Sequence, residues 1–226
     1  MARDRPRKEV IYGRRPVAEA QRGRRRVHRV WTLDDLPTPE LTRLAGSPDH
    51  QGVVAEVDPY PYADSRELLK HPDALVVALD QVQDPRNLGA VCRSAEAVGA
   101  AGVVIPSRRS AAVTAAAAKA SAGAVEHLRV ARVPNLADWL AVAKDAGAWI
   151  HGAESGAPTP YASADLTGKV VLVLGSEGGG LRRRVAQSCD LLVSIPLRGR
   201  VGSLNVSAAA AVLLFEAARQ RAAGNR

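Results

Sequence analysis

Five short apolar runs, separated from one another by segments of helical character, limit the folds that this chain can adopt. Apolar runs without polar alternation are typical of strands buried on both faces, and such strands occur in parallel sheets that helices cover. We therefore predict an α/β fold with a parallel sheet. The strands are expected at LVVAL (75–79), GVVI (102–105), WIHGA (149–153), VVLVL (170–174) and LLVSI (191–195), and the helices at 87–99, about 111–120, 135–146, 181–187 and 205–221.

The residues before Leu75 follow a different pattern, which predicts a small α/β domain ahead of the larger one. Strand-like pieces lie at 27–31 and 52–57. The polar, Pro-bearing segment 58–72 is typical of a linker that ends in a short helix. We expect three parts. These are a flexible basic arm at 1–8, a small domain at 9–72 and a larger domain at 73–226.

The net charge of +8 is concentrated at the N-terminus. Residues 1–30 hold 11 Lys and Arg against 3 Asp and Glu, whereas residues 31–226 hold 20 of each kind. A basic segment on a neutral body is typical of a protein that binds RNA or DNA, and a solubilising tail is the alternative. Arginines within a helical-looking segment favour nucleic acid. The candidate RNA-binding residues are Arg14, Arg15, Arg24, Arg25 and Arg26.

This chain lacks the residues that several classes of protein require. Cys92 and Cys189 have neither a Cys-x-x-Cys nor a disulfide pattern, and the five histidines show no metal-ligand spacing, so we expect buried, unreactive thiols and no metal. No apolar run approaches the roughly 18 residues of a membrane helix, and no signal peptide is recognisable. We expect a cytoplasmic protein. No triad, carboxylate pair or Walker loop supports a hydrolase or a kinase.

The first candidate segment is LDQVQDPRNLGAVCRSAEAVGA, residues 79–100. Asn87 stands where a helix N-cap is expected. Arg93 lies six residues later among apolar and small residues, so we expect a lone cation on a core-like helix, where it requires a hydrogen-bonding or anionic partner. Two interpretations are open, a structural ion pair with an acid such as Asp80 or Glu96, and a functional role.

The second candidate segment is VVLVLGSEGGGLRRRVAQSCD, residues 170–190. Gly175 follows a strand directly, but a dinucleotide fingerprint requires glycine two residues later, where this chain has Glu177. A carboxylate there would repel a pyrophosphate. It opposes an oxidoreductase that binds NAD or FAD, and it favours a neutral or cationic ligand. The arginines at 182–184 form either a solvated helix face or a phosphate contact.

The third candidate segment is IPLRGRVGSLNVSAAAAVLLFEAAR, residues 195–219. Ser203, Asn205 and Ser207 crowd the start of a long helix, where free N–H groups favour polar and anionic partners. One of the three suffices to cap the helix. We expect the helix to bury its apolar residues from Val212 to Phe215. Its small residues at 208–211 allow close packing within the fold or against another subunit.

These three segments, in this order, resemble the motifs of the SpoU (TrmH-like) family of RNA ribose 2′-O-methyltransferases, in the SPOUT superfamily. The resemblance covers about residues 75–221 and rests on DPRNLGAVCRSAEAVGA, LGSEGGGL and the third segment. It implies a sheet with a C-terminal trefoil knot, S-adenosylmethionine as cofactor and a homodimer with the C-terminal helix in the interface. The cofactor would contact Leu174, Gly175, Ile195, Leu197 and Leu204.

The resemblance also implies roles at the reacting end of the site. Arg93 would act on the target 2′-hydroxyl, with Asn87 orienting it, and Glu177, Ser203 and Asn205 would complete the RNA side. Because arginine keeps its proton in proteins, Arg93 is either an unusual general base or a group that fixes the hydroxyl and a phosphate.

The N-terminal part is similar to the small substrate-binding domain of the same family. YGRRPVAEA (12–20) and HQGVVAEV (50–57) match its beginning and end, with a shorter segment between them than the family usually has. This two-domain form implies methylation of a guanosine in large-subunit (23S) rRNA. The alternatives are a tRNA target and a non-catalytic RNA-binding protein of the same fold.

Overall fold

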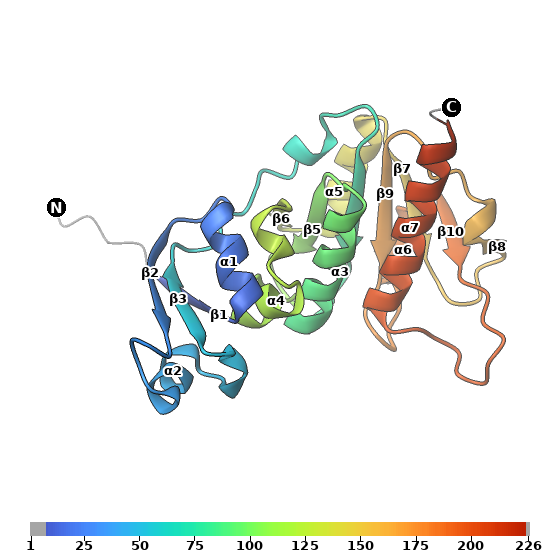
Figure 1. Ribbon diagram of the computed structural model, residues 1–226. Coiled ribbons are helices and arrows are strands. Elements are labelled where there is room, and N and C mark those ends of the chain that lie inside the picture. The colour runs from blue at the N-terminus through green and yellow to red at the C-terminus, as the bar shows by residue number, and fades with distance from the viewer. Residues whose placement is uncertain (1–7, 225–226) are drawn as a thin grey trace.

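The computed structural model describes residues 8–224 and contains a seven-stranded sheet beside a three-stranded one (Figure 1). The strands of the large sheet are β4 (Leu75–Leu79), β5 (Gly102–Pro106), β6 (Val130–Val133), β7 (Trp149–Ala153), β8 (Thr159–Pro160), β9 (Val170–Leu174) and β10 (Leu191–Ser194). They lie in the order β6-β5-β4-β9-β7-β10-β8, and every pairing is parallel. The predicted α/β fold with a parallel sheet is confirmed. The short strands β6 and β8 were not predicted, because Arg132 interrupts one and the other has only two residues.

Helices cover both faces of the large sheet (Figure 1). One layer holds α3 (Pro85–Ala97), α4 (Ala115–Ala120) and α7 (Val206–Gly224), and the other holds α5 (Leu136–Asp145) and α6 (Arg183–Gln187). The strand β4 shows why its sequence has no polar alternation. Leu75, Val77 and Leu79 pack into the core beneath the first layer, whereas Val76 and Ala78 pack beneath the second.

Two local predictions, one in helix α3 and one in helix α7, were wrong. The N-cap of α3 is Asp84, whose side chain accepts a hydrogen bond from the Arg86 N–H at 2.8 Å, because Pro85 occupies the first helical position. Asn87 therefore lies inside the first turn, and its amide is available for other contacts. At the other end of the chain, Phe215 of α7 is 55% exposed rather than buried.

The small sheet contains β1 (Glu9–Tyr12), β2 (Val27–Thr32) and β3 (Val53–Val57), antiparallel in the order β1-β3-β2. Helices α1 (Arg14–Arg22) and α2 (Thr38–Ala45) accompany it, and four single-turn 3₁₀ helices lie at Pro48–His50, Glu67–Leu69, Ala124–Glu126 and Tyr161–Ser163. Ile11, Val17 and Ala55 belong to the same continuous apolar core as α3 and β4. The small sheet is thus packed onto the large one through buried side chains.

Segment 58–72 connects the two sheets, but it is not a loose linker. The Tyr60 hydroxyl is within 3.0 Å of the carbonyl oxygens of Val125 and Leu128, and the Tyr62 hydroxyl accepts a hydrogen bond from the Val113 N–H at 2.9 Å. Burial raises the pKa of Tyr60, which keeps this phenol protonated as a donor. The predicted short helix at the end of the segment is the 3₁₀ turn Glu67–Leu69.

Within residues 8–224, no helix has the length and apolar character needed to cross a bilayer. The same residues contain no group of three or more His, Cys, Asp or Glu side chains placed to hold a metal ion. Cys92 is buried and Cys189 is half-buried, and burial raises the pKa of both thiols to about 12. Both are therefore protonated and unreactive near neutral pH.

His151 on β7 predicts a pH dependence of stability. The residue is 4% exposed, and neither ring nitrogen has a hydrogen-bond partner among the described residues. Burial lowers the pKa of His151 below its ordinary value, although Asp190 and Asp165 oppose the shift. Because the folded protein takes up the proton less readily than the unfolded chain, stability is lost as pH falls below about 6.5.

We expect the free energy of unfolding to decrease between about pH 7 and pH 5, and His151→Leu to remove part of that decrease. Urea unfolding of both proteins at the two pH values measures the difference. Equal pH dependence in the two proteins would show that His151 does not contribute.

Candidate active site

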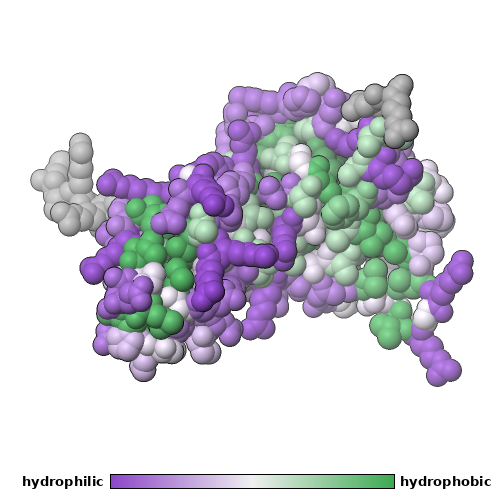
Figure 2. Space-filling model, viewed as in Figure 1, coloured by the Kyte–Doolittle hydropathy of each residue, from purple (hydrophilic) through white to green (hydrophobic). Residues whose placement is uncertain are grey.

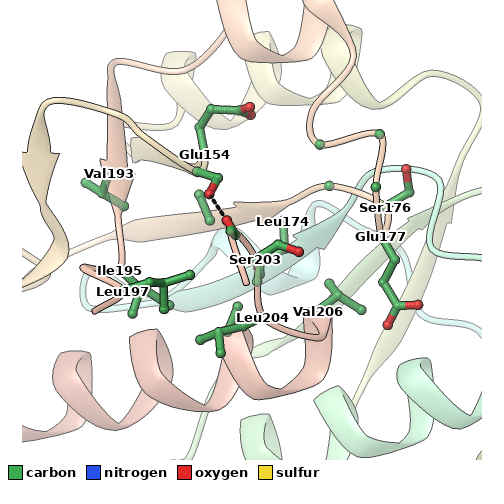
Figure 3. Close-up of a pocket in the computed structure, with 18 residues that line it drawn as sticks. Glu154, Leu174, Ser176, Glu177, Val193, Ile195, Leu197, Ser203, Leu204 and Val206 are labelled. Carbon is green, nitrogen blue, oxygen red and sulfur yellow. Dashed lines mark hydrogen bonds between the residues drawn. The ribbon is translucent and has the colours of Figure 1, made fainter. Parts of the chain in front are cut away.

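A pocket with a volume of about 370 Å³ opens at the carboxyl edge of the large sheet, where β7, β9 and β10 end (Figure 3). This volume lies in the range of small-molecule sites, about 300–1,000 Å³. The five residues predicted to contact a cofactor all line it, namely Leu174, Gly175, Ile195, Leu197 and Leu204. Glu177 and Ser203, predicted for the RNA side, line the same pocket.

Residues 175–180 form a closed turn at one wall of the pocket. The N–H groups of Ser176 and Gly180 each donate to the other residue's carbonyl oxygen, at 3.2 Å and 3.0 Å. A Cβ atom at Gly175 would lie 2.1 Å from the carbonyl carbon and oxygen of Gly180, so only glycine fits there. Gly178 and Gly180 have φ values of 76° and 60°, in the left-handed region that favours glycine. The glycines close this turn, and the exposed Glu177 projects from it.

Asn87, Glu177 and Asn205 come from three separate segments and meet at the mouth of the pocket. The Asn87 amide donates to Glu177 Oε1 at 3.0 Å, and the Asn205 amide donates to Asn87 Oδ1 at 3.1 Å and to the same Glu177 oxygen. The side-chain oxygen of Asn205, Oδ1, caps α7 by accepting hydrogen bonds from the Ser207 N–H and hydroxyl, at 2.9 Å and 2.6 Å. The cap fixes Asn205 from the other side, so these three side chains form a preorganised polar cluster.

Asp80 connects the first candidate segment (79–100) to the second (170–190) through hydrogen bonds to Arg182. It is fully buried at the end of β4, and it accepts hydrogen bonds from the Arg182 N–H at 2.9 Å and from Arg182 Nε at 2.8 Å. Arg184 forms an ion pair with Asp138 at 2.7 Å. Two of the three arginines at 182–184 are thus paired within the chain. Asp80 holds the end of the glycine-rich turn against β4.

The structure places Arg93 differently from the sequence-based expectation. Arg93 lies on an exposed face of α3, and it forms no ion pair or hydrogen bond within residues 8–224. Of the two open interpretations, the structural ion pair is not formed: Arg182 occupies the Asp80 carboxylate, and Arg93 pairs with neither Asp80 nor Glu96 among the described residues. Arg93 is not among the residues that line the pocket, and it lies nearly two helical turns beyond Asn87.

The pocket also has a wall that the sequence-based prediction missed. Glu154 and Ser155 follow β7 directly and line the pocket, and the Ser155 hydroxyl donates to the Gly202 carbonyl oxygen at 2.6 Å, the bond drawn in Figure 3. Polar residues immediately after a predicted strand were the available signal, because all carboxyl ends of a parallel sheet meet at one edge. Two carboxylates line the pocket, and no Lys, Arg or His of the described chain does. This electrostatic character favours a cationic ligand.

Residues 74–215, well over half of the chain, match the sequence profile of the SpoU rRNA methylase family. The matched range contains the glycine-rich turn, the polar cluster and every pocket-lining residue. The chain belongs to this family. It is an RNA methyltransferase, and the expected resemblance is confirmed.

Two curated relatives show how far this similarity extends. A putative TrmH family tRNA/rRNA methyltransferase of Bacillus subtilis is 36% identical over 94% of this chain and 96% of its own length. An uncharacterised tRNA/rRNA methyltransferase of Synechocystis is 37% identical over 94% of this chain, which spans only 63% of that longer relative.

Two solved structures of the family differ in how much of this chain they cover. An S-adenosylmethionine-bound rRNA methyltransferase from Sinorhizobium meliloti has a TM-score of 0.83 and 26% identity, covering 94% of this chain and 87% of its own. A structure titled for 2-OH methylation of C/U34 on tRNA has a TM-score of 0.60 and 25% identity, covering 69% of this chain and 100% of its own.

The arginines predicted to bind RNA in this SpoU methylase have different environments. Arg14, Arg15 and Arg26 are exposed, although Arg14 Nε donates to the Gln51 carbonyl oxygen at 3.3 Å. Arg25 is 5% exposed and forms a bidentate ion pair with the buried Glu126, so the prediction that it binds RNA was wrong. The Arg24 guanidinium donates hydrogen bonds to the backbone carbonyl oxygens of Glu126 and Leu128.

The expected basic arm falls almost wholly on residues 1–7, outside the described chain. The described Lys8 pairs with Glu56 on β3.

Proposed function

We propose that this SpoU methylase transfers a methyl group from S-adenosylmethionine to a ribose 2′-hydroxyl of RNA, at the junction between the pocket and the polar cluster. One observation carries the proposal: the cluster of Asn87, Glu177 and Asn205 stands at the mouth of a pocket lined by apolar groups and carboxylates. A donor bound inside would face an RNA held outside.

The pocket fits S-adenosylmethionine in size and in charge. Leu174, Ile195 and Leu204 supply apolar surface for an adenine base, and the two carboxylates suit a ligand with cationic groups. The cofactor is S-adenosylmethionine, which supplies an already activated methyl group when bound. The protein therefore contributes mainly alignment.

The polar cluster and Arg93 are assigned to the RNA side of the reaction. Glu177 holds the two asparagine amides in place, and Ser203 adds a hydroxyl from the same mouth of the pocket. Arg93 is exposed and has no partner in the described chain, so its guanidinium is available to an incoming RNA. Since arginine stays protonated, we assign Arg93 to binding the target hydroxyl and a neighbouring phosphate.

We infer that the target is rRNA, and a guanosine of the large subunit follows from the family resemblance. The small N-terminal sheet supports this inference. The Sinorhizobium rRNA methyltransferase aligns over nearly the whole chain, whereas the tRNA-related structure covers only 69% of it. The small domain presents the exposed Arg14, Arg15 and Arg26 for RNA phosphates, and in Figure 2 its surface combines hydrophilic side chains with hydrophobic patches.

We further propose that the chain forms a homodimer through α7. Phe215 is 55% exposed and Val212 is half-buried on this helix, and Figure 2 shows hydrophobic surface along it. Exposed apolar surface of this kind marks a protein contact. The trefoil knot implied by the resemblance stays a prediction.

The function is tested with Arg93→Ala. We expect methyl transfer to 23S rRNA to fall by about 100-fold or more, because a charged contact made at the reacting group is lost. S-adenosylmethionine affinity, measured by calorimetry, should not change, since Arg93 does not line the pocket.

The matched control for this test is Arg183→Ala, which removes an exposed arginine from α6 on the other face of the sheet. Its transfer rate should equal that of the wild type. Unchanged transfer by Arg93→Ala would overturn the assignment of Arg93. Absence of 2′-O-methylation in any rRNA or tRNA offered to the wild-type protein would overturn the function.

A further inference from the structure

We propose that Glu154 binds the α-ammonium group of S-adenosylmethionine and thereby selects ligands that carry the amino-acid part of the cofactor. The inference rests on the proposed function, because it takes the pocket as the cofactor site. Glu154 lies outside the three sequence segments that resemble the family. Its position after β7, at the edge where β9 and β10 also end, brings it to the pocket.

The Glu154 carboxylate is half-buried and has no cationic partner. It forms no ion pair within residues 8–224, and its side chain accepts one long hydrogen bond there, from the Leu181 N–H at 3.4 Å. A Cβ atom at Gly180 would lie 3.1 Å and 3.3 Å from its two oxygens, so the carboxylate is held closely against the glycine-rich turn. A carboxylate partly removed from water without a cation is unfavourable, and a cationic ligand group would stabilise it.

The arrangement of the pocket decides which cationic group this is. In Figure 3, Val193, Ile195 and Leu197 lie on one side, Glu177 lies on another, and Glu154 lies apart from both. The apolar side suits the adenine base. The methyl group must be presented toward Glu177, where the polar cluster and the RNA meet, and the sulfonium that carries it belongs on that side. The ammonium group is the remaining cation, and Glu154 is the remaining carboxylate.

The experiment compares three ligands by calorimetry with the full-length protein. S-adenosylmethionine and S-adenosylhomocysteine both carry the ammonium group, whereas 5′-methylthioadenosine keeps the nucleoside and the sulfur but lacks the amino acid. Glu154→Gln retains the size of the side chain and an acceptor for the Leu181 N–H. We expect the Glu154→Gln substitution to lower the affinities for S-adenosylmethionine and S-adenosylhomocysteine by about three- to tenfold each, which is the effect of one partly exposed charged contact. The affinity for 5′-methylthioadenosine should not change.

Glu177→Gln is the matched control, because it removes the same charge from another side of the same pocket. It should not change the affinity of S-adenosylhomocysteine relative to 5′-methylthioadenosine. Urea unfolding of both variants establishes that each is folded.

Each other result would overturn the inference in a recognisable way. An equal loss of affinity for 5′-methylthioadenosine would place Glu154 at the nucleoside. A loss of affinity for S-adenosylmethionine alone would place it at the sulfonium. Three unchanged affinities would show that Glu154 contacts no part of the cofactor. A wild-type protein that bound none of the three ligands would overturn the proposed function instead.

Discussion

Gly175→Ala is expected to weaken cofactor binding strongly. The added Cβ atom would lie 2.1 Å from the carbonyl carbon and oxygen of Gly180, and neither backbone atom can move without opening the turn. An open turn would displace the wall of the pocket and withdraw Glu177 from Asn87. We expect S-adenosylmethionine affinity to fall by about 100-fold or more by calorimetry, since a pocket wall and its backbone contacts are lost together.

Gly179→Ala provides a control within the same turn. A Cβ atom there would approach only the hydroxyl of Ser176, at 2.9 Å, and that side chain can rotate away. We expect its affinity to stay within about threefold of the wild type, because no backbone atom has to move. If Gly175→Ala bound the cofactor as tightly as Gly179→Ala, the closed turn would not be part of the cofactor site.

The second large effect is expected where the small sheet packs against the large one. Arg25 is 5% exposed and Glu126 is 1% exposed, and both carboxylate oxygens of Glu126 accept hydrogen bonds from the guanidinium. Glu9 contacts the same guanidinium at 3.2 Å but is partly exposed. Glu126→Leu would leave a buried cation with one weak partner. We expect the free energy of unfolding to decrease by about 3–5 kcal/mol.

Arg25→Met combined with Glu126→Leu separates the loss of the pair from the burial of an unpaired charge. We expect the double variant to recover most of the stability, because apolar groups of similar size replace a buried ion pair at little net change in free energy. Urea unfolding of the two single variants and the double variant measures the coupling. If Glu126→Leu lowered the free energy of unfolding by less than about 1 kcal/mol, the Arg25–Glu126 pair would be solvated rather than buried.

The fold and the convergence of the site could be predicted from the sequence for one physical reason. Strands buried on both faces, such as VVLVL at 170–174, carry only apolar residues, and parallel order then brings their carboxyl ends to one edge. The segments that follow β4, β9 and β10 therefore had to meet. Asn87, Glu177 and Asn205 do meet there.

The direction of individual charged side chains could not be predicted in the same way. Arg24, Arg25 and Arg26 are adjacent and identical in type, yet only Arg25 is buried, because Glu126 lies 101 residues away in the chain and directly beside it in the fold. Arg93 appeared to lie on a core helix because small residues surround it in sequence. In the structure those small residues face α4 and α7, and the arginine faces solvent.

Segment 58–72, through the hydrogen bonds of Tyr60 and Tyr62, and the Arg25–Glu126 pair hold the small sheet against the large one. The exposed Arg14 and Arg15, which we propose to bind RNA phosphates, are held in place relative to the pocket, because α1 and the large sheet share one apolar core. In the proposed function, the bound phosphates and the methylated ribose therefore lie at one fixed separation. We expect the protein to select RNAs whose own folding sets that separation, so that RNA shape contributes to target choice in addition to base identity.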